Sequence, residues 1–113
     1  MNISVIKTQG YNVVNLRGDF LTEPEQKAFR TRIRELADGG ARHIVVNLGE
    51  VGHINSCGLG SMVCAMVMMR KVGGDVRFAG VNADVGSLLE ITHLNRVFQI
   101  YPGVREATLG PGL

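Results

Sequence analysis

Residues 52–63 read GHINSCGLGSMV and place two glycines, Gly58 and Gly60, in the first turns of an expected helix. A glycine inside a helix costs about 1 kcal/mol of stability relative to alanine. A position without a side chain lets another backbone approach closely, either from the same chain or from a partner. This stretch therefore decides both the fold and the place of a candidate site.

The segments around this stretch predict a parallel strand pair joined by a helix. Residues 43–48, HIVVNL, form a continuous apolar run of the kind found in a strand that is covered on both faces. A helix is expected over 56–72, followed by the turn GGD and a strand over 76–80. A strand, a helix and a second strand form a right-handed crossover, so the two strands should be parallel and 43–48 should be central.

The first third of the chain predicts a hairpin followed by a helix. ISVIK and YNVVNLRG, residues 3–7 and 11–18, are rich in β-branched residues and are separated by a turn. Thr22 can cap a helix, Pro24 suits its first turn, and glycines at 39–40 end it. Helical spacing places Phe29, Ile33, Leu36 and Ala37 inward, and Arg30, Arg34 and Glu35 toward water.

The last third predicts smaller elements. A short helix over 82–94 should turn Val85, Leu88, Leu89 and Leu94 inward, residues 97–101 should form an edge strand, and a helix should begin after Pro102. We therefore expect one α/β domain over residues 1–113, with an ordered core to about residue 108, a tail over 109–113, and a mixed sheet of four to five strands.

Composition excludes several classes of function. The chain has 113 residues and a net charge of +2, and Arg30, Arg32 and Arg34 are interleaved with Glu35 and Asp38 and are not set in a block, which is unlike a nucleic-acid-binding surface. Its longest apolar run, SMVCAMVMM at 61–69, is too short to cross a bilayer and reads as a buried helix. The amino terminus lacks an export signal, so we expect a cytoplasmic protein.

The two cysteines give no disulfide or metal-binding pattern. In the cytoplasm Cys57 and Cys64 would be reduced thiols, and their spacing on one helix is not that of metal ligands. We interpret Cys64 as a core residue. Cys57 lies at a helix start, where a thiol is acidified, so a cysteine hydrolase using His53 and Asn55 is one alternative. Three such groups within five residues cannot easily align for catalysis.

Ser56 is the candidate centre of the site. It follows a central parallel strand, at the sheet edge where sites gather in α/β folds. Serine is a favoured N-cap residue, and the same backbone N–H groups and helix dipole would accept a phosphate on its oxygen. The alternative interpretation is that Ser56 is only a cap and that Gly58 and Gly60 only allow tight packing on the sheet.

Residues 43–63, HIVVNLGEVGHINSCGLGSMV, resemble the signature of the STAS domain family, in its branch of anti-sigma-factor antagonists. The resemblance extends over nearly the whole chain. VVNLRGDF at 13–20 is similar to the second strand and its exit, DVRFAGVNADV at 75–85 to the fourth strand, and LLEITHLNRVFQIY at 88–101 to the final helix and edge strand. The expected fold is therefore a single STAS-like α/β domain.

The resemblance implies a switch protein without enzymatic activity, cofactor or metal. Members of this branch bind a serine-kinase anti-sigma factor and so free a sigma factor for transcription, until the kinase phosphorylates the serine that matches Ser56. A metal-dependent serine/threonine phosphatase reverses the change. The implied partner-binding residues are Asp19, Phe20, Gly52, His53, Asn55, Ser56, Cys57, Gly58, Leu59 and Ser61.

The sequence departs from the family pattern at two positions. The usual Asp before the phosphorylated serine is Asn55, which keeps hydrogen-bonding capacity and removes a charge that kinase or phosphatase would meet. The next serine is Cys57, where alanine is also common. The alternative role is a STAS scaffold or ligand-binding subunit of a stress-signalling or lipid-transport complex without serine phosphorylation. The absence of an attached domain favours a free-standing antagonist, and a monomer is expected.

Overall fold

The structure, a computed structural model, describes residues 2–8 and 10–109. Its elements, in chain order, are β1 (Asn2–Thr8), β2 (Tyr11–Arg17), α1 (Glu23–Asp38), β3 (His43–Glu50), α2 (Ser56–Lys71), β4 (Asp75–Ala79), α3 (Ala83–Ile91), a 3-10 turn η1 (Leu94–Arg96), β5 (Gln99–Tyr101) and α4 (Val104–Ala107). Of the tail predicted at 109–113, only Leu109 lies within the described residues.

The described strands form one mixed sheet in the order β1-β2-β3-β4-β5. β1 pairs antiparallel with β2, and the pairs β2–β3, β3–β4 and β4–β5 are all parallel. The predicted hairpin, the central position of β3 and its parallel pairing with β4 are confirmed. The short strand predicted over 97–101 is confirmed as edge strand β5, although it begins only at Gln99.

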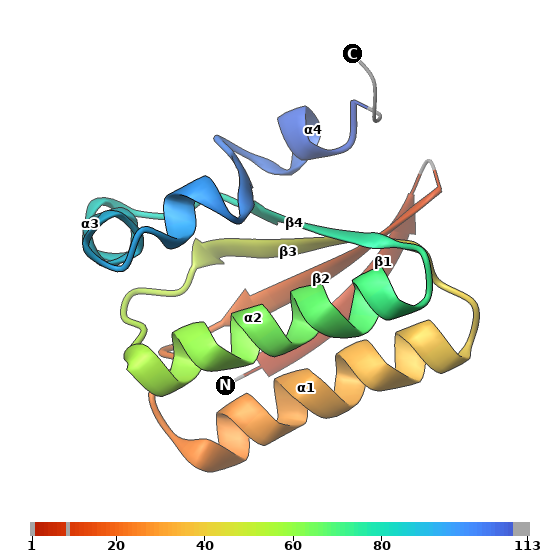
Figure 1. The fold of residues 1–113 in the computed structure, drawn as a ribbon, viewed down its shortest axis with the longest axis horizontal. Helices are drawn as coiled ribbons and strands as arrows, with labels where there is room; N and C mark the ends of the chain where they lie inside the picture. Colours follow the sequence, from red (N-terminus) through yellow and green to blue (C-terminus); the bar gives the residue numbers. More distant parts are fainter. Residues whose placement is uncertain (1, 9, 110–113) are drawn as a thin grey trace.

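α1 and α2 lie side by side on one face of the sheet (Figure 1). The main core lies between these helices and the strands, and α3 adds to it at the end where the parallel strands stop. Its fully buried members include Phe20, Phe29, Ile33, Leu48, Met62, Met69, Phe78 and Leu89. Burial of this apolar surface is the main stabilising contribution to the domain.

The start of α1 is fixed by a capping box. The backbone N–H and the hydroxyl of Thr22 both donate to Oε1 of Glu25, each at 3.0 Å. These hydrogen bonds, the backbone one first, lower the pKa of the Glu25 carboxyl. A carboxyl with a lowered pKa stabilises the fold when ionised, so this contribution is present at neutral pH and is lost as acid protonates Glu25.

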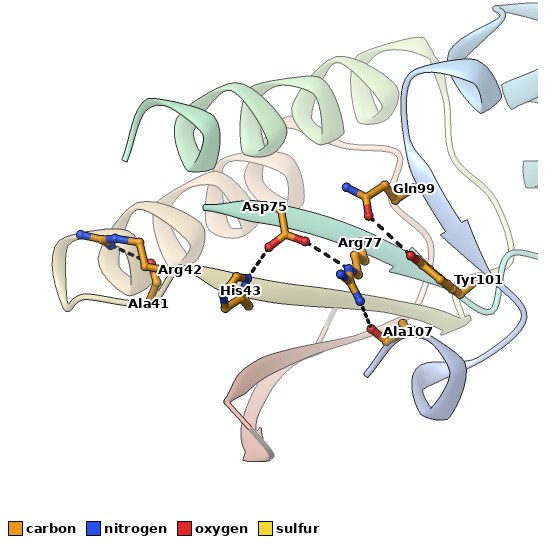
Figure 2. A network of polar contacts seen from close by, with 8 residues as sticks. All are labelled: Ala41, Arg42, His43, Asp75, Arg77, Gln99, Tyr101 and Ala107. Carbon is orange, nitrogen blue, oxygen red and sulfur yellow. Dashed lines mark hydrogen bonds and ion pairs between the residues drawn. The ribbon is translucent and has the colours of Figure 1, made fainter. Parts of the chain in front are cut away.

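The opposite face of the sheet is covered in part by α4, which is attached by Arg77 (Figure 2). Nη1 of Arg77 donates to the carbonyl oxygen of Ala107 at 2.8 Å, and Nε donates to Asp75 at 3.1 Å. Asp75 also contacts Nδ1 of His43 at 2.5 Å. The guanidinium carbon lies 5.3 Å from the Tyr11 ring centroid and 5.5 Å from that of Tyr101. This buried arginine therefore joins β4 to the last described helix.

Two predictions of side-chain environment were wrong. Arg30 does not simply face water, because its Nη1 donates to the hydroxyl of Ser61 on α2 at 2.7 Å. Cys64 is exposed and is not a core residue. The inward face of α2 carries Met62, Ala65, Met66 and Met69, and Cys64 falls outside that arc of the helix.

Candidate functional site

The candidate site lies where the carboxyl ends of β2 and β3 lead into α1 and α2 (Figure 1). The exits of the two strands run side by side: the backbone N–H of Phe20 donates to the carbonyl oxygen of His53 at 2.9 Å, and Phe20 forms a parallel bridge with Ile54. Asp19 and Phe20, at the exit of β2, therefore lie beside the loop before Ser56.

Asn55, and not Ser56, is the N-cap of α2, which corrects the prediction for Ser56. Oδ1 of Asn55 accepts from the backbone N–H of Gly58 at 2.9 Å, as an N-cap side chain does. The same carboxamide donates through Nδ2 to the carbonyl oxygen of Leu21 at 2.8 Å. Ser56 is the first residue of the helix, and its side chain is exposed with no hydrogen bond among the described residues.

Gln26 is a residue of the site that the sequence analysis missed. It is buried on α1, and its Nε2 donates to Oδ1 of Asn55 at 3.1 Å. The signal was present in the helical spacing, because Gln26 lies on the same inward stripe as Phe29 and Ile33. A polar side chain on such a stripe requires a hydrogen-bond partner, and Asn55 is that partner.

The two glycines of the opening stretch have different environments. A Cβ added at Gly58 would lie 2.7 Å from Cγ2 of Ile54 and 2.8 Å from the carbonyl oxygen of Phe20. A Cβ added at Gly60 would meet nothing within 4 Å among the described residues outside its own helix backbone, and Gly60 is exposed. Tight internal packing therefore explains Gly58, as the alternative interpretation had it, but does not explain Gly60.

The loop before α2 is held from a second side by Asn82, which the sequence analysis also missed. Nδ2 of Asn82 donates to the carbonyl oxygens of Val51 and Gly52, at 3.3 and 3.0 Å. Its Oδ1 accepts from the backbone N–H of Val85 at 2.8 Å, so Asn82 is also the N-cap of α3. An asparagine at the start of the helix predicted over 82–94 was the available signal.

The residues predicted to bind a partner divide into a surface group and a buried group. Asp19, His53, Ser56 and Cys57 are exposed, and Gly52 and Asn55 are half-buried. Phe20, Gly58, Leu59 and Ser61 are buried beneath them. We call the exposed residues around the start of α2, together with the half-buried Gly52, the Ser56 surface, which consists of Asp19, Gly52, His53, Ser56, Cys57 and Gly60.

The arrangement does not assemble the triad of a cysteine hydrolase. The carboxamide of Asn55 is directed at Gly58, Gln26 and Leu21, and Nδ1 of His53 lies 3.2 Å from Oδ1 of Asp19. Asn55 therefore cannot orient His53 toward Cys57. Within residues 2–8 and 10–109, no group of three or more His, Cys, Asp or Glu side chains is placed to hold a metal ion. Over the same residues, the helices are all too short or too polar to cross a membrane.

The profile of the STAS domain matches residues 2–107. A relative named anti-sigma-B factor antagonist, from Staphylococcus aureus, is 30% identical over 105 residues, which cover 91% of this chain and 94% of the relative. The fold resembles that of SpoIIAA from Bacillus in its phosphorylated form, with a TM-score of 0.73 and 18% identity over 94% of this chain and 96% of the other. The unphosphorylated form of SpoIIAA gives a TM-score of 0.72 and 16% identity over 93% and 92% of the two chains.

Alanine substitutions at the two glycines should change stability in opposite directions. Gly58→Ala should lower the free energy of unfolding by about 1–3 kcal/mol, because its methyl group overlaps Ile54 and Phe20. Gly60→Ala should raise it by up to about 1 kcal/mol, because alanine has the higher helix propensity and the position is open. Urea unfolding measures both, and a loss of stability for Gly60→Ala would contradict the open environment.

Replacement of Asn55 should show how much its hydrogen bonds contribute to the stability of the domain. Asn55→Ala should lower the free energy of unfolding by about 2–3 kcal/mol, because it removes the cap and leaves the buried Gln26 amide unpaired. Asn55→Asp should lower the free energy of unfolding by less. The carboxylate can still accept hydrogen bonds from Gly58 and Gln26, and only the hydrogen bond donated to Leu21 is lost. The exposed Asn95→Ala is the control. An Asn55→Ala protein within about 0.5 kcal/mol of wild type would refute this role.

Proposed function

The chain belongs to the STAS domain family, and on that basis we propose that it is an anti-sigma-factor antagonist switched off by phosphorylation of Ser56. The observation that carries the proposal is the position of the Ser56 hydroxyl. It is exposed at the first residue of α2 and has no hydrogen bond within the described part of the chain. Modification of this hydroxyl therefore breaks no internal contact.

The site supports a switch that acts at the surface. A phosphate at Ser56 would stand at the positive end of the α2 dipole, where negative charge is stabilising. The cap of the helix belongs to Asn55, so it stays intact when Ser56 is modified. Both forms of SpoIIAA resemble this fold to nearly the same degree, which agrees with a switch that leaves the fold unchanged.

Nearly two negative charges added beside Gly60 would oppose the docking of a partner. A Cβ at Gly60 would lie in open space, and Gly60 lies in a helix, where glycine weakens the free domain. Close approach by the backbone of a partner would explain why glycine stands here despite its cost to helix stability. Asp19, Gly52, His53 and Cys57 would complete the contact, and the buried Phe20, Gly58, Leu59 and Ser61 would support it from below.

The proposed partners follow from the names of the relatives and from the chemistry of the switch. The name of the Staphylococcus aureus relative supports an anti-sigma factor as the binding partner. Phosphorylation requires that this factor, or a protein bound to it, be a serine kinase. Return to the binding state requires a phosphoserine phosphatase, for which we propose the metal-dependent serine/threonine class.

Phosphorylation should occur at Ser56 alone. Incubation with the serine-kinase anti-sigma factor of the same organism and ATP should add one phosphate to the wild-type chain, measured by intact mass. Ser56→Ala should abolish the addition, and Ser87→Ala, which changes an exposed serine on α3, should leave it intact. A wild-type chain without a mass increase, or a Ser56→Ala chain that is still modified, would refute phosphorylation of Ser56.

Gly60→Ala should weaken binding of the anti-sigma factor without lowering the stability of the domain. The variant should bind the anti-sigma factor at least about tenfold more weakly, since its methyl group fills the space reserved for the partner backbone. Its free energy of unfolding should be no lower than that of wild type. Gly86→Ala is the matched control, because Gly86 is a helical glycine on α3 where an added Cβ would also meet nothing within 4 Å among the described residues outside its own helix backbone. Unchanged affinity of Gly60→Ala, measured by titration calorimetry, would refute the close approach.

A further inference from the structure

α2 has a second apolar face that the domain does not bury. Its inward face is formed by methionines and Ala65, yet Val63, Cys64, Val67 and Met68 are apolar and lie wholly or partly at the surface. Val67 retains 42% of its accessible surface. A helix that covers one face of a sheet normally carries polar residues on its outer side. The outer face of α2 therefore has the composition of a contact surface.

This face forms one wall of an open groove between α1 and α2. The groove has a volume of about 390 Å³ and is lined by Arg30, Arg34, Val63, Cys64, Val67, Met68 and Lys71. Its apolar residues come from α2, and its charged lining residues are all cations. Arg30 pairs with Glu23, whereas Arg34 and Lys71 have no ion-pair partner within the part of the chain that the structure describes. α2 itself contains no acidic residue.

We propose that this groove binds an acidic amphipathic helix of a partner protein. The apolar face of such a helix would cover Val67 and its neighbours, and its carboxylates would pair with Arg34 and Lys71. Val67 lies eleven residues beyond Ser56, which is about 16 Å along the helix axis. The groove is thus a second binding surface, separate from the Ser56 surface, and it does not depend on phosphorylation.

Charge and shape select this occupant over two others. A second copy of the chain packed through the same groove would bring two sets of unpaired cations together, which is unfavourable. An anionic membrane would also attract the cations, but a flat membrane surface would not fill the groove between the two helices that these apolar residues line. An acidic amphipathic helix lying in the groove would pair its carboxylates with the cations and would fill the concavity with its apolar face.

The test uses a designed peptide as the probe. A helical peptide of about 18 residues, with leucines on one face flanked by glutamates, is titrated into the isotope-labelled chain at about 50 mM salt. Amide NMR shifts should change at residues 63–71 and along the facing side of α1, and not at 52–60. A matched peptide with lysine in place of glutamate should not bind. Shift changes centred on the Ser56 surface, or equal binding of both peptides, would overturn the proposal.

Substitutions by glutamate test whether the peptide binds in the groove. Arg34→Glu and Val67→Glu should each weaken binding of the acidic peptide by about tenfold or more, and the loss for Arg34→Glu should shrink at high salt. Arg32→Glu is the matched control, because Arg32 lies on the same helix but lines the opposite side, beside β1. All three positions are exposed, so the variants should keep the wild-type unfolding midpoint. Equal effects of Arg34→Glu and Arg32→Glu would refute a defined groove.

Two further measurements separate this proposal from others. If the chain binds phosphatidylglycerol vesicles in a way that depends on Arg34 but does not bind the peptide, the occupant of the groove is a membrane surface and the proposal of a partner helix is overturned. Ser56→Asp should bind the acidic peptide as tightly as wild type, since the groove is distant from Ser56. Failure of Ser56 phosphorylation would therefore leave this result unchanged, and failure of the peptide to bind would leave the role of Ser56 unchanged.

Discussion

The carboxamide of Asn55 is the contact on which the site depends. One side chain accepts hydrogen bonds from Gly58 and Gln26 and donates one to Leu21, so it joins the start of α2 to α1 and to the exit of β2. An aspartate at this position would keep the accepted bonds and lose the donated one, because a carboxylate has no hydrogen to give. In this chain the asparagine therefore supports the site, and the departure from the family pattern has a structural use.

This contact also explains why Ser56 is available for modification. Because Asn55 supplies the cap, the exposed side chain of Ser56 makes no hydrogen bond within the described part of the chain. Gly58 lets the helix start pack against Phe20 and Ile54, whereas Gly60 leaves open space on the outer side. Two glycines that look alike in the sequence thus have two different environments, one packed inside the domain and one open to solvent. A helix start held by the hydrogen bonds of Asn55, with an exposed serine above it, is suited to a switch that changes binding and not folding.

The sequence was sufficient for the order and type of the elements, because their hydrophobic periodicity and their glycine and proline boundaries are clear. It was not sufficient for details that depend on the rotation of a helix or on distant partners. Asn55 and Ser56 are both good N-cap residues, and the choice is made by contacts with Gln26 and Leu21, which are 29 and 34 residues away. Cys64 was misplaced because a continuous apolar run does not show which arc of the helix faces the sheet.

The most direct test of the central claim is the affinity of the anti-sigma factor for the unphosphorylated and the Ser56-phosphorylated chain, measured by calorimetry on samples whose unfolding midpoints are also compared. We expect phosphorylation to weaken binding by at least about a hundredfold and to leave the unfolding midpoint unchanged. Equal affinity of the two forms would contradict a switch at Ser56. A large loss of stability on phosphorylation would contradict a switch that acts only at the surface.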